Sequence, residues 1–129
     1  MLHDLTNRSD IKTLVQTFYG RIRKDVYLAP IFEKHITDWN AHFEHLTDFW
    51  ENSLFMNGAY KGNPLKVHEK VDAAEGYGLN EQHFGIWLNY WSQTIDNLFE
   101  GDNASILKLR ARKMGTHIHV HLFEARPKK

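Results

Sequence analysis

The chain of 129 residues carries sixteen Lys and Arg side chains against sixteen Asp and Glu, so its formal net charge is zero. This balance argues against a nucleic-acid or anionic-membrane partner, and the absence of cysteine excludes disulfides, thiolate metal sites and thiol nucleophiles. The length suits one domain over residues 1–129, and no apolar run approaches the roughly 18 residues of a membrane span. Because Met1-Leu2-His3-Asp4 is not typical of a signal peptide, we expect a cytoplasmic protein.

Apolar residues at helical spacing predict two long helices in the first half of the chain. The two stripes consist of Ile11, Leu14, Val15, Phe18 and Ile22, and of Trp39, Phe43, Leu46, Phe49, Trp50 and Leu54. Ser9 or Asp10 is expected to cap the first helix, and Thr37 or Asp38 the second, because a short oxygen side chain accepts an otherwise unpaired backbone N–H. Between them, Pro30 suits the start of a short helical turn.

Glycines and caps divide the second half of the chain in the same way. Gly58 is expected to end the second long helix, and Pro64 begins a brief helix through about residue 74. Gly76 and Gly78 break the chain before Asn80, which is expected to cap the next helix. The last two stripes consist of Phe84, Trp87, Leu88, Trp91, Ile95, Leu98 and Phe99, and of Ile106, Leu107, Ala111, Met114, Ile118 and Leu122. Four long helices with shorter ones between them predict an all-α fold.

Three of the nine histidines, His117, His119 and His121, are spaced like a metal motif. On a helix His119 projects away from the other two, and the remaining i,i+4 pair falls short of the three or four ligands that zinc takes. We therefore interpret this segment as a solvated face, and we expect His3 and His35 at the surface as well.

His42, His45, His68 and Tyr19 adjoin the apolar stripes. An inward imidazole at His42 needs a hydrogen-bond partner or a ligand, because burying it unpaired costs about 1–3 kcal/mol. Aromatic residues make up 13% of the chain, which suits either a packed core or the wall of a site for a flat ligand. Taken singly, each of these polar residues is compatible with an ordinary boundary position.

Four ordered blocks resemble the truncated haemoglobins of group III. Residues 18–25 and 28–32 read FYGRIRKD and LAPIF, and the next block joins DW at 38–39 to His42 and to DFW at 48–50. The block that resembles the family's haem-ligand segment reads YKGNPL from residue 60 and leads to His68, and residues 83–91 read HFGIWLNYW. The double-glycine motifs of other truncated globin groups are missing, which favours group III.

This resemblance implies a two-over-two arrangement of globin helices around haem b, with the iron bound by His68. By the same resemblance, the open iron position, where O₂ and also NO or CO would bind, is faced by Tyr19, His42, Leu46 and Trp87. The other residues implied at the haem are Phe32, which would stack on the porphyrin, Tyr60 and His45 near the propionates, Phe49 and Leu65.

The implied chemistry is consistent with these residue types. Oxygen on ferrous iron acquires negative charge, so donors from Tyr19 and Trp87 would each contribute about 1–2 kcal/mol, or roughly five- to thirtyfold in ligand dissociation. Leu46 is apolar where some truncated globins have glutamine, so we expect tight oxygen binding to depend on the other two. NO dioxygenation, peroxide chemistry and oxygen scavenging all stay open. Any turnover implies a separate reductase, because the chain has no flavin or nicotinamide motif.

Residues 69–82 depart from the family pattern, because this stretch is longer than usual and lacks the Leu-Pro that often follows the haem histidine. Its conformation therefore stays open. Two other interpretations are a non-haem iron or zinc bundle and a cofactor-free helical interaction module. The first lacks a Glu-x-x-His motif and has Glu44 away from the apolar stripe. The second does not explain the inward positions of Tyr19 and His42 together with the His68 block.

Overall fold

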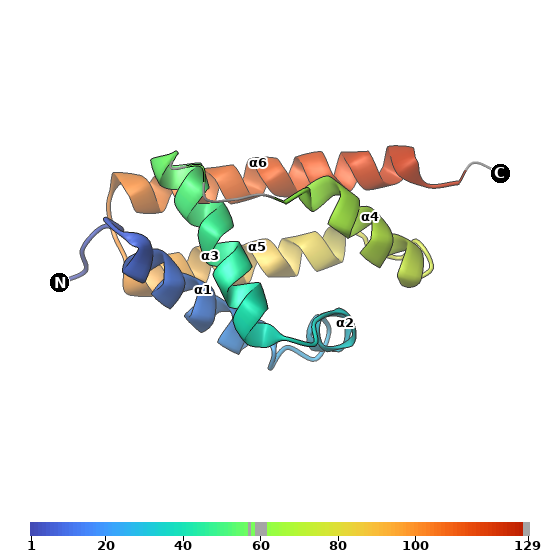
Figure 1. Ribbon diagram of the computed structural model, residues 1–129, viewed down its shortest axis with the longest axis horizontal. Coiled ribbons are helices and arrows are strands. Elements are labelled where there is room, and N and C mark those ends of the chain that lie inside the picture. Colours follow the sequence, from blue (N-terminus) through green and yellow to red (C-terminus); the bar gives the residue numbers. More distant parts are fainter. Residues whose placement is uncertain (57, 59–61, 128–129) are drawn as a thin grey trace.

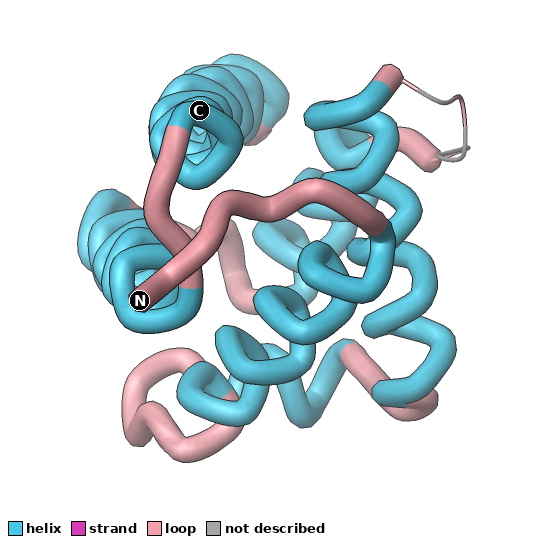
Figure 2. The backbone as a smooth tube through the Cα atoms, turned by 90° about the vertical axis from the view of Figure 1, so that its left-hand side faces the viewer, coloured by secondary structure: helices cyan, strands magenta, loops and turns pink. Residues whose placement is uncertain are grey.

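Six helices follow one another along the part of the chain that the computed structural model describes, residues 1–56, 58 and 62–127 (Figure 1). They are α1 (Arg8–Ile22), α2 (Ala29–His35), α3 (Trp39–Phe55), α4 (Pro64–Ala74), α5 (Glu81–Leu98) and α6 (Asp102–Ala125). Within these described residues the backbone forms no strand, as the colouring of Figure 2 shows. The predicted all-α fold, with four long helices and two short ones, is confirmed.

The start of α1 differs from the prediction. Its N-cap is Asn7 rather than Ser9 or Asp10, because the Asn7 side-chain oxygen accepts the Asp10 backbone N–H at 3.0 Å. Asp10 lies in the first turn instead, where its carboxylate accepts the Thr6 backbone N–H at 2.9 Å and interacts favourably with the helix dipole.

Asp38 and Asn80 cap α3 and α5 as predicted, each with its side-chain oxygen accepting backbone N–H groups of the first turn. The end of α3 lies slightly earlier than expected. The residue that takes the left-handed conformation is Met56, with φ of 55°, whereas Gly58 donates its backbone N–H to the Asn52 side chain at 2.7 Å.

The short helix α4 has the predicted bounds. The Asn63 side chain caps it, and Pro64 occupies its first turn, where the missing proline N–H costs no helical hydrogen bond. The chain then turns sharply through Gly76 and Tyr77, whose φ angles are 67° and 60°. This turn accounts for the stretch before α5 that the sequence left open.

The helices form two layers. In Figure 1, α5 and α6 run side by side along the long axis and α3 crosses in front of α5. Figure 2 looks nearly along α5 and α6 and separates them from α1 and α3. Helix α1 packs against α3 and α5, and α4 packs against α6. None of the described helices is long and apolar enough to span a membrane.

The main hydrophobic cluster lies where α1, α3, α5 and the first half of α6 meet. At its centre the fully buried Trp91 stacks between Trp50 and Trp87, with ring centroids 4.6 and 5.6 Å apart. Phe18 packs edge-on against Trp91 at 5.1 Å. Large aromatic side chains of this kind contribute most of the burial energy of a core.

A second, smaller cluster joins α6 to the segment before α5. Its buried members are Leu79, Ile118 and Leu122, and Leu65 and Val71 of α4 pack against them. The apolar interior is thus divided between a part that holds α1, α3 and α5 together and a part that attaches α4 to α6.

Candidate functional site

His68 lies on α4 with its ring in one defined orientation. Its Nδ1 atom is 2.6 Å from the backbone carbonyl oxygen of Pro64. Because a carbonyl oxygen only accepts hydrogen bonds, Nδ1 carries the proton and Nε2 keeps its lone pair. Burial lowers the pKa of His68, against the opposing effect of the Pro64 hydrogen bond, so the ring is neutral near pH 7. A neutral imidazole with a free Nε2 is the form that binds a metal ion.

Tyr19 and Trp87 form a pair inside the main cluster. The Tyr19 side chain is 5% exposed, and burial raises the pKa of its phenol, while a hydrogen bond from the Trp87 indole acts in the opposite direction. The phenol therefore stays protonated at physiological pH. Its O–H group is a donor that lacks competition from bulk water.

His42 lies against the same pair with one nitrogen buried. Its ring meets the Tyr19 ring edge-on, with centroids 5.2 Å apart. Among the described residues, no hydrogen-bond partner reaches its buried Nε2 atom. Burial, together with the neighbouring His45, lowers the pKa of His42 to about 4, so the imidazole is neutral near pH 7. An unpartnered buried nitrogen is costly, which indicates a position where a ligand atom belongs.

The other apolar candidates are divided between the two hydrophobic clusters. Phe32 of α2 meets the Tyr19 ring edge-on at 5.7 Å, and Leu46 and Phe49 of α3 are half-buried against the main cluster. Leu65 of α4 packs against the second cluster, one turn before His68 on the helix. The structure therefore brings Tyr19, His42, Phe32 and Trp87 together and carries His68 and Leu65 on a separate helix.

The two residues predicted near the propionates are His45 and Tyr60, and the structure describes only the first. His45 is exposed on α3, beside His42. Tyr60 lies outside the described residues, so its predicted role is untested.

Trp39 is a further neighbour of the site, although the sequence analysis placed it in an apolar stripe and in a resembling block without giving it a role there. Its indole lies 5.8 Å from the His42 ring, and the Arg23 guanidinium covers it at 4.2 Å. Arg23 also pairs with Glu33 of α2 at 2.9 Å. The cation–π contact joins the end of α1 to the start of α3 beside His42, and the ion pair attaches α2 to the same arginine. Arginine and tryptophan sixteen positions apart give no signal in the sequence.

The histidines near the C-terminus differ in part from the solvated face that was predicted. His117 is exposed, but His119 stacks on Phe84 at 5.3 Å, and His121 bonds with the Glu69 carboxylate at 2.9 Å. These contacts arise because α4 and the start of α5 pack on this half of α6. The described residues contain no group of three or more side chains able to hold a metal ion directly.

Comparison with known proteins gives one consistent relationship. No family model matches the chain. The group 3 truncated haemoglobin ctb of Campylobacter jejuni is 27% identical over 128 residues, which cover 96% of this chain and 97% of that protein. The crystal structure of group III truncated haemoglobin from Campylobacter jejuni matches with a TM-score of 0.85 and 26% identity, over 99% of this chain and all of the other. Both similarities extend over nearly the whole chain, and the fold agrees with the two-over-two helical arrangement that the family resemblance implied. The chain is therefore similar, in sequence and in fold, to a group III truncated haemoglobin over nearly its whole length.

Proposed function

We propose that the protein binds haem b through His68 and holds O₂, and also NO and CO, at the ferrous iron beside Tyr19, Trp87 and His42. The observation that carries the proposal is the state of His68. Its Nδ1–H is committed to the Pro64 carbonyl, which leaves a neutral Nε2 as a metal ligand on a helix of its own.

The chemistry of the remaining residues fits a haem. Half-buried apolar side chains are available on three helices, among them Phe32, Phe49 and Leu65. The buried Nε2 of His42 lacks a partner among the described residues, and a bound gas or a water would supply one. Haem bound at this site would supply an iron with one open position for a diatomic ligand.

The residues beside the gas ligand act as hydrogen-bond donors. Burial keeps the Tyr19 phenol protonated, and the Trp87 indole N–H has no other protonation state to adopt. His42 is neutral near pH 7, because its pKa lies near 4. Bound oxygen would therefore be stabilised by fixed neutral donors rather than by a titrating cation, and its release would be slow.

The partner of His68 favours reversible gas binding. A carboxylate partner on Nδ1 would raise the basicity of the ligating nitrogen, whereas the Pro64 carbonyl is neutral and has a weaker effect. Turnover such as NO dioxygenation or peroxide reduction would draw its electrons from a separate reductase.

Reconstitution of the purified protein with haemin tests the proposal. We expect a Soret band that shifts when CO is added to the reduced protein. His68→Gly is expected to abolish stable haem binding and to recover it when imidazole is supplied, whereas the control His117→Gly removes an exposed histidine of α6 and keeps the wild-type spectrum. A colourless wild-type protein, or a His68→Gly variant that retains haem normally without imidazole, would refute the proposed ligand.

A further inference from the structure

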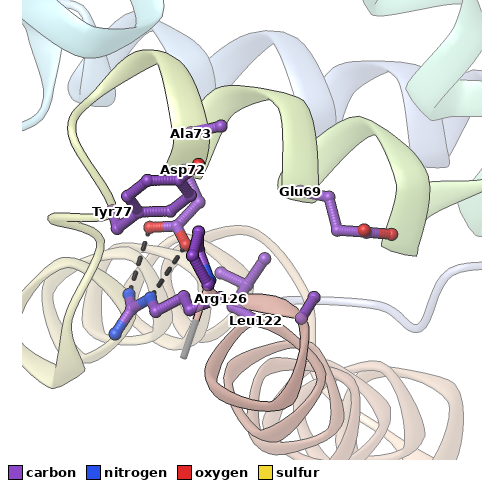
Figure 3. A pocket seen from close by; sticks show the side chains of 8 residues that line it. Glu69, Asp72, Ala73, Tyr77, Leu122 and Arg126 are labelled. Atoms are coloured by element: carbon purple, nitrogen blue, oxygen red, sulfur yellow. Dashed lines mark hydrogen bonds and ion pairs between the residues drawn. The ribbon is translucent and has the colours of Figure 1, made fainter. Parts of the chain in front are cut away.

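A buried carboxylate, Asp72, is held in a two-pronged hydrogen-bonded ion pair at the end of α4. Its side chain is 3% exposed and accepts from Arg126 Nε at 2.9 Å and from Arg126 Nη2 at 3.1 Å (Figure 3). Arg126 is the residue after the last turn of α6. Arginine is suited to this role because its planar guanidinium meets both carboxylate oxygens at once.

The same two side chains also hold the backbone of Leu79. The Leu79 N–H donates to Asp72 Oδ1 at 3.1 Å, and the Leu79 carbonyl accepts from Arg126 Nη2 at 2.6 Å. We call the set Asp72, Leu79 and Arg126 the Asp72 bridge. Tyr77, at a positive φ of 60°, donates its N–H to the Asp72 carbonyl at 2.7 Å, so the sharp turn closes onto the bridge. A left-handed backbone at a tyrosine is unfavourable and persists only where its surroundings impose it.

The Asp72 bridge connects the two helices that carry opposite sides of the proposed site. Asp72 lies four residues, or about one turn, beyond His68 on α4. Leu79 directly precedes Asn80, the N-cap of α5, and α5 carries Trp87. The bridge therefore fixes the end of the His68 helix relative to the start of the Trp87 helix.

Close packing alone does not hold α4 in place. A partly open pocket of about 210 Å³ lies between α4 and α6, and Figure 3 shows Glu69 and Ala73 on one side of it and Leu122 on the other. Polar contacts span this space: the Asp72 bridge at one end and the Glu69–His121 pair at the other. The Glu69–His121 pair is about one-third exposed and correspondingly weak, so the bridge is the stronger of these two attachments between α4 and α6.

We propose that Arg126 is a positioning residue for His68: through Asp72 and Leu79 it fixes the placement of α4 and so the direction in which His68 Nε2 meets the haem iron. This inference rests on the proposed function, because it assumes that His68 is the ligand. Arg126 is not among the residues proposed to contact haem or gas.

Two measurements on Arg126→Gln test the inference. In the haem-free protein, hydrogen exchange of the α4 amides is expected to become at least tenfold faster, while exchange in α1 and α3 stays within twofold of wild type. In the ferrous haem protein, the iron–histidine stretching band in resonance Raman is expected to shift or broaden, while the C–O stretching band of the CO complex, which reports on Tyr19 and Trp87, stays in place.

Arg112→Gln is the matched control, because Arg112 is an exposed arginine of α6, the helix that Arg126 follows, and both measurements should stay at wild-type values. If Arg126→Gln fails to fold, Arg126→Lys replaces it. Lysine keeps the charge but cannot bind both Asp72 oxygens and the Leu79 carbonyl together, so α4 exchange is expected to rise at least threefold.

A lower melting temperature with unchanged α4 exchange and an unchanged iron–histidine band would overturn the inference, since Arg126 would then only stabilise the fold. Wild-type hydrogen exchange of the α4 amides in Arg126→Lys would also overturn the inference. A wild-type protein that takes up no haem would refute the proposed function, and the exchange measurement would still decide whether Arg126 holds α4.

Discussion

Tyr19→Phe removes one oxygen atom from the gas-binding side and should speed oxygen release. The Tyr19 side chain is 5% exposed, so water does not replace the lost O–H donor. A hydrogen bond to a partly charged acceptor contributes about 1–2 kcal/mol, which corresponds to roughly a five- to thirtyfold change in rate. The Trp87 N–H also loses its acceptor in the unliganded protein, so its own contact with bound oxygen is expected to strengthen and to place the effect at the lower end of this range.

Stopped-flow replacement of bound O₂ by CO measures the dissociation rate directly. Tyr90→Phe is the matched control, because the Tyr90 phenol donates to Asp25 at 2.7 Å and is not part of the site. It is expected to destabilise the fold by about 1 kcal/mol and to leave oxygen release unchanged. A Tyr19→Phe dissociation rate within twofold of wild type, or an equal acceleration in Tyr90→Phe, would show that Tyr19 is not a donor to the gas.

Three further predictions concern pH and packing. The pKa of His42 is about 4 in the folded protein against an ordinary value of 6.5, so the unfolded chain binds more protons between these pH values. The free energy of unfolding from urea titrations should therefore fall as the pH drops from 6.5 to 4. His42→Leu should remove that part of the pH dependence. If both proteins lose stability in parallel, His42 is not the responsible group. Trp91→Ala should cost about 3–5 kcal/mol, because Trp91 is fully buried at the centre of the main cluster, and a loss below 1 kcal/mol in the same assay would contradict this packing. Gly101→Ala should cost about 1–3 kcal/mol, because Gly101 has a φ of 138° and a Cβ there would meet Asp4 at 2.6 Å. The control Gly20→Ala should be neutral or stabilising, because Gly20 has open space around it in α1. Equal effects of the two substitutions would refute the steric argument.

The four long helices could be predicted from the sequence because each carries its own apolar stripe. Pro64 and Asn80 marked the starts of α4 and α5 correctly because a proline or a cap acts within one turn of its own position. The start of α1 was missed because Asn7, Ser9 and Asp10 are all good caps, and the choice among them depends on how the preceding chain approaches the helix.

The candidate site was less accessible than the helices. The inward position of His42 followed from its stripe, but its contact with Trp39 and the Arg23 side chain above that ring depends on how α1 and α3 cross. The Asp72 bridge joins residues 54 positions apart, and Arg126 lies beyond the last apolar residue of α6, where no periodic signal extends. His121 was likewise assigned to solvent because its partner Glu69 lies on another helix.

The proposed role of His68 as axial ligand can be checked in a crystal structure of the protein loaded with haem. We expect a bond from His68 Nε2 to the iron, with Nδ1 still bonded to the Pro64 carbonyl. We expect Tyr19, Trp87 and His42 on the opposite face of the haem, around the sixth position. An iron bound through His42, or a haem on the outer surface of an unchanged apolar interior, would contradict the proposed role.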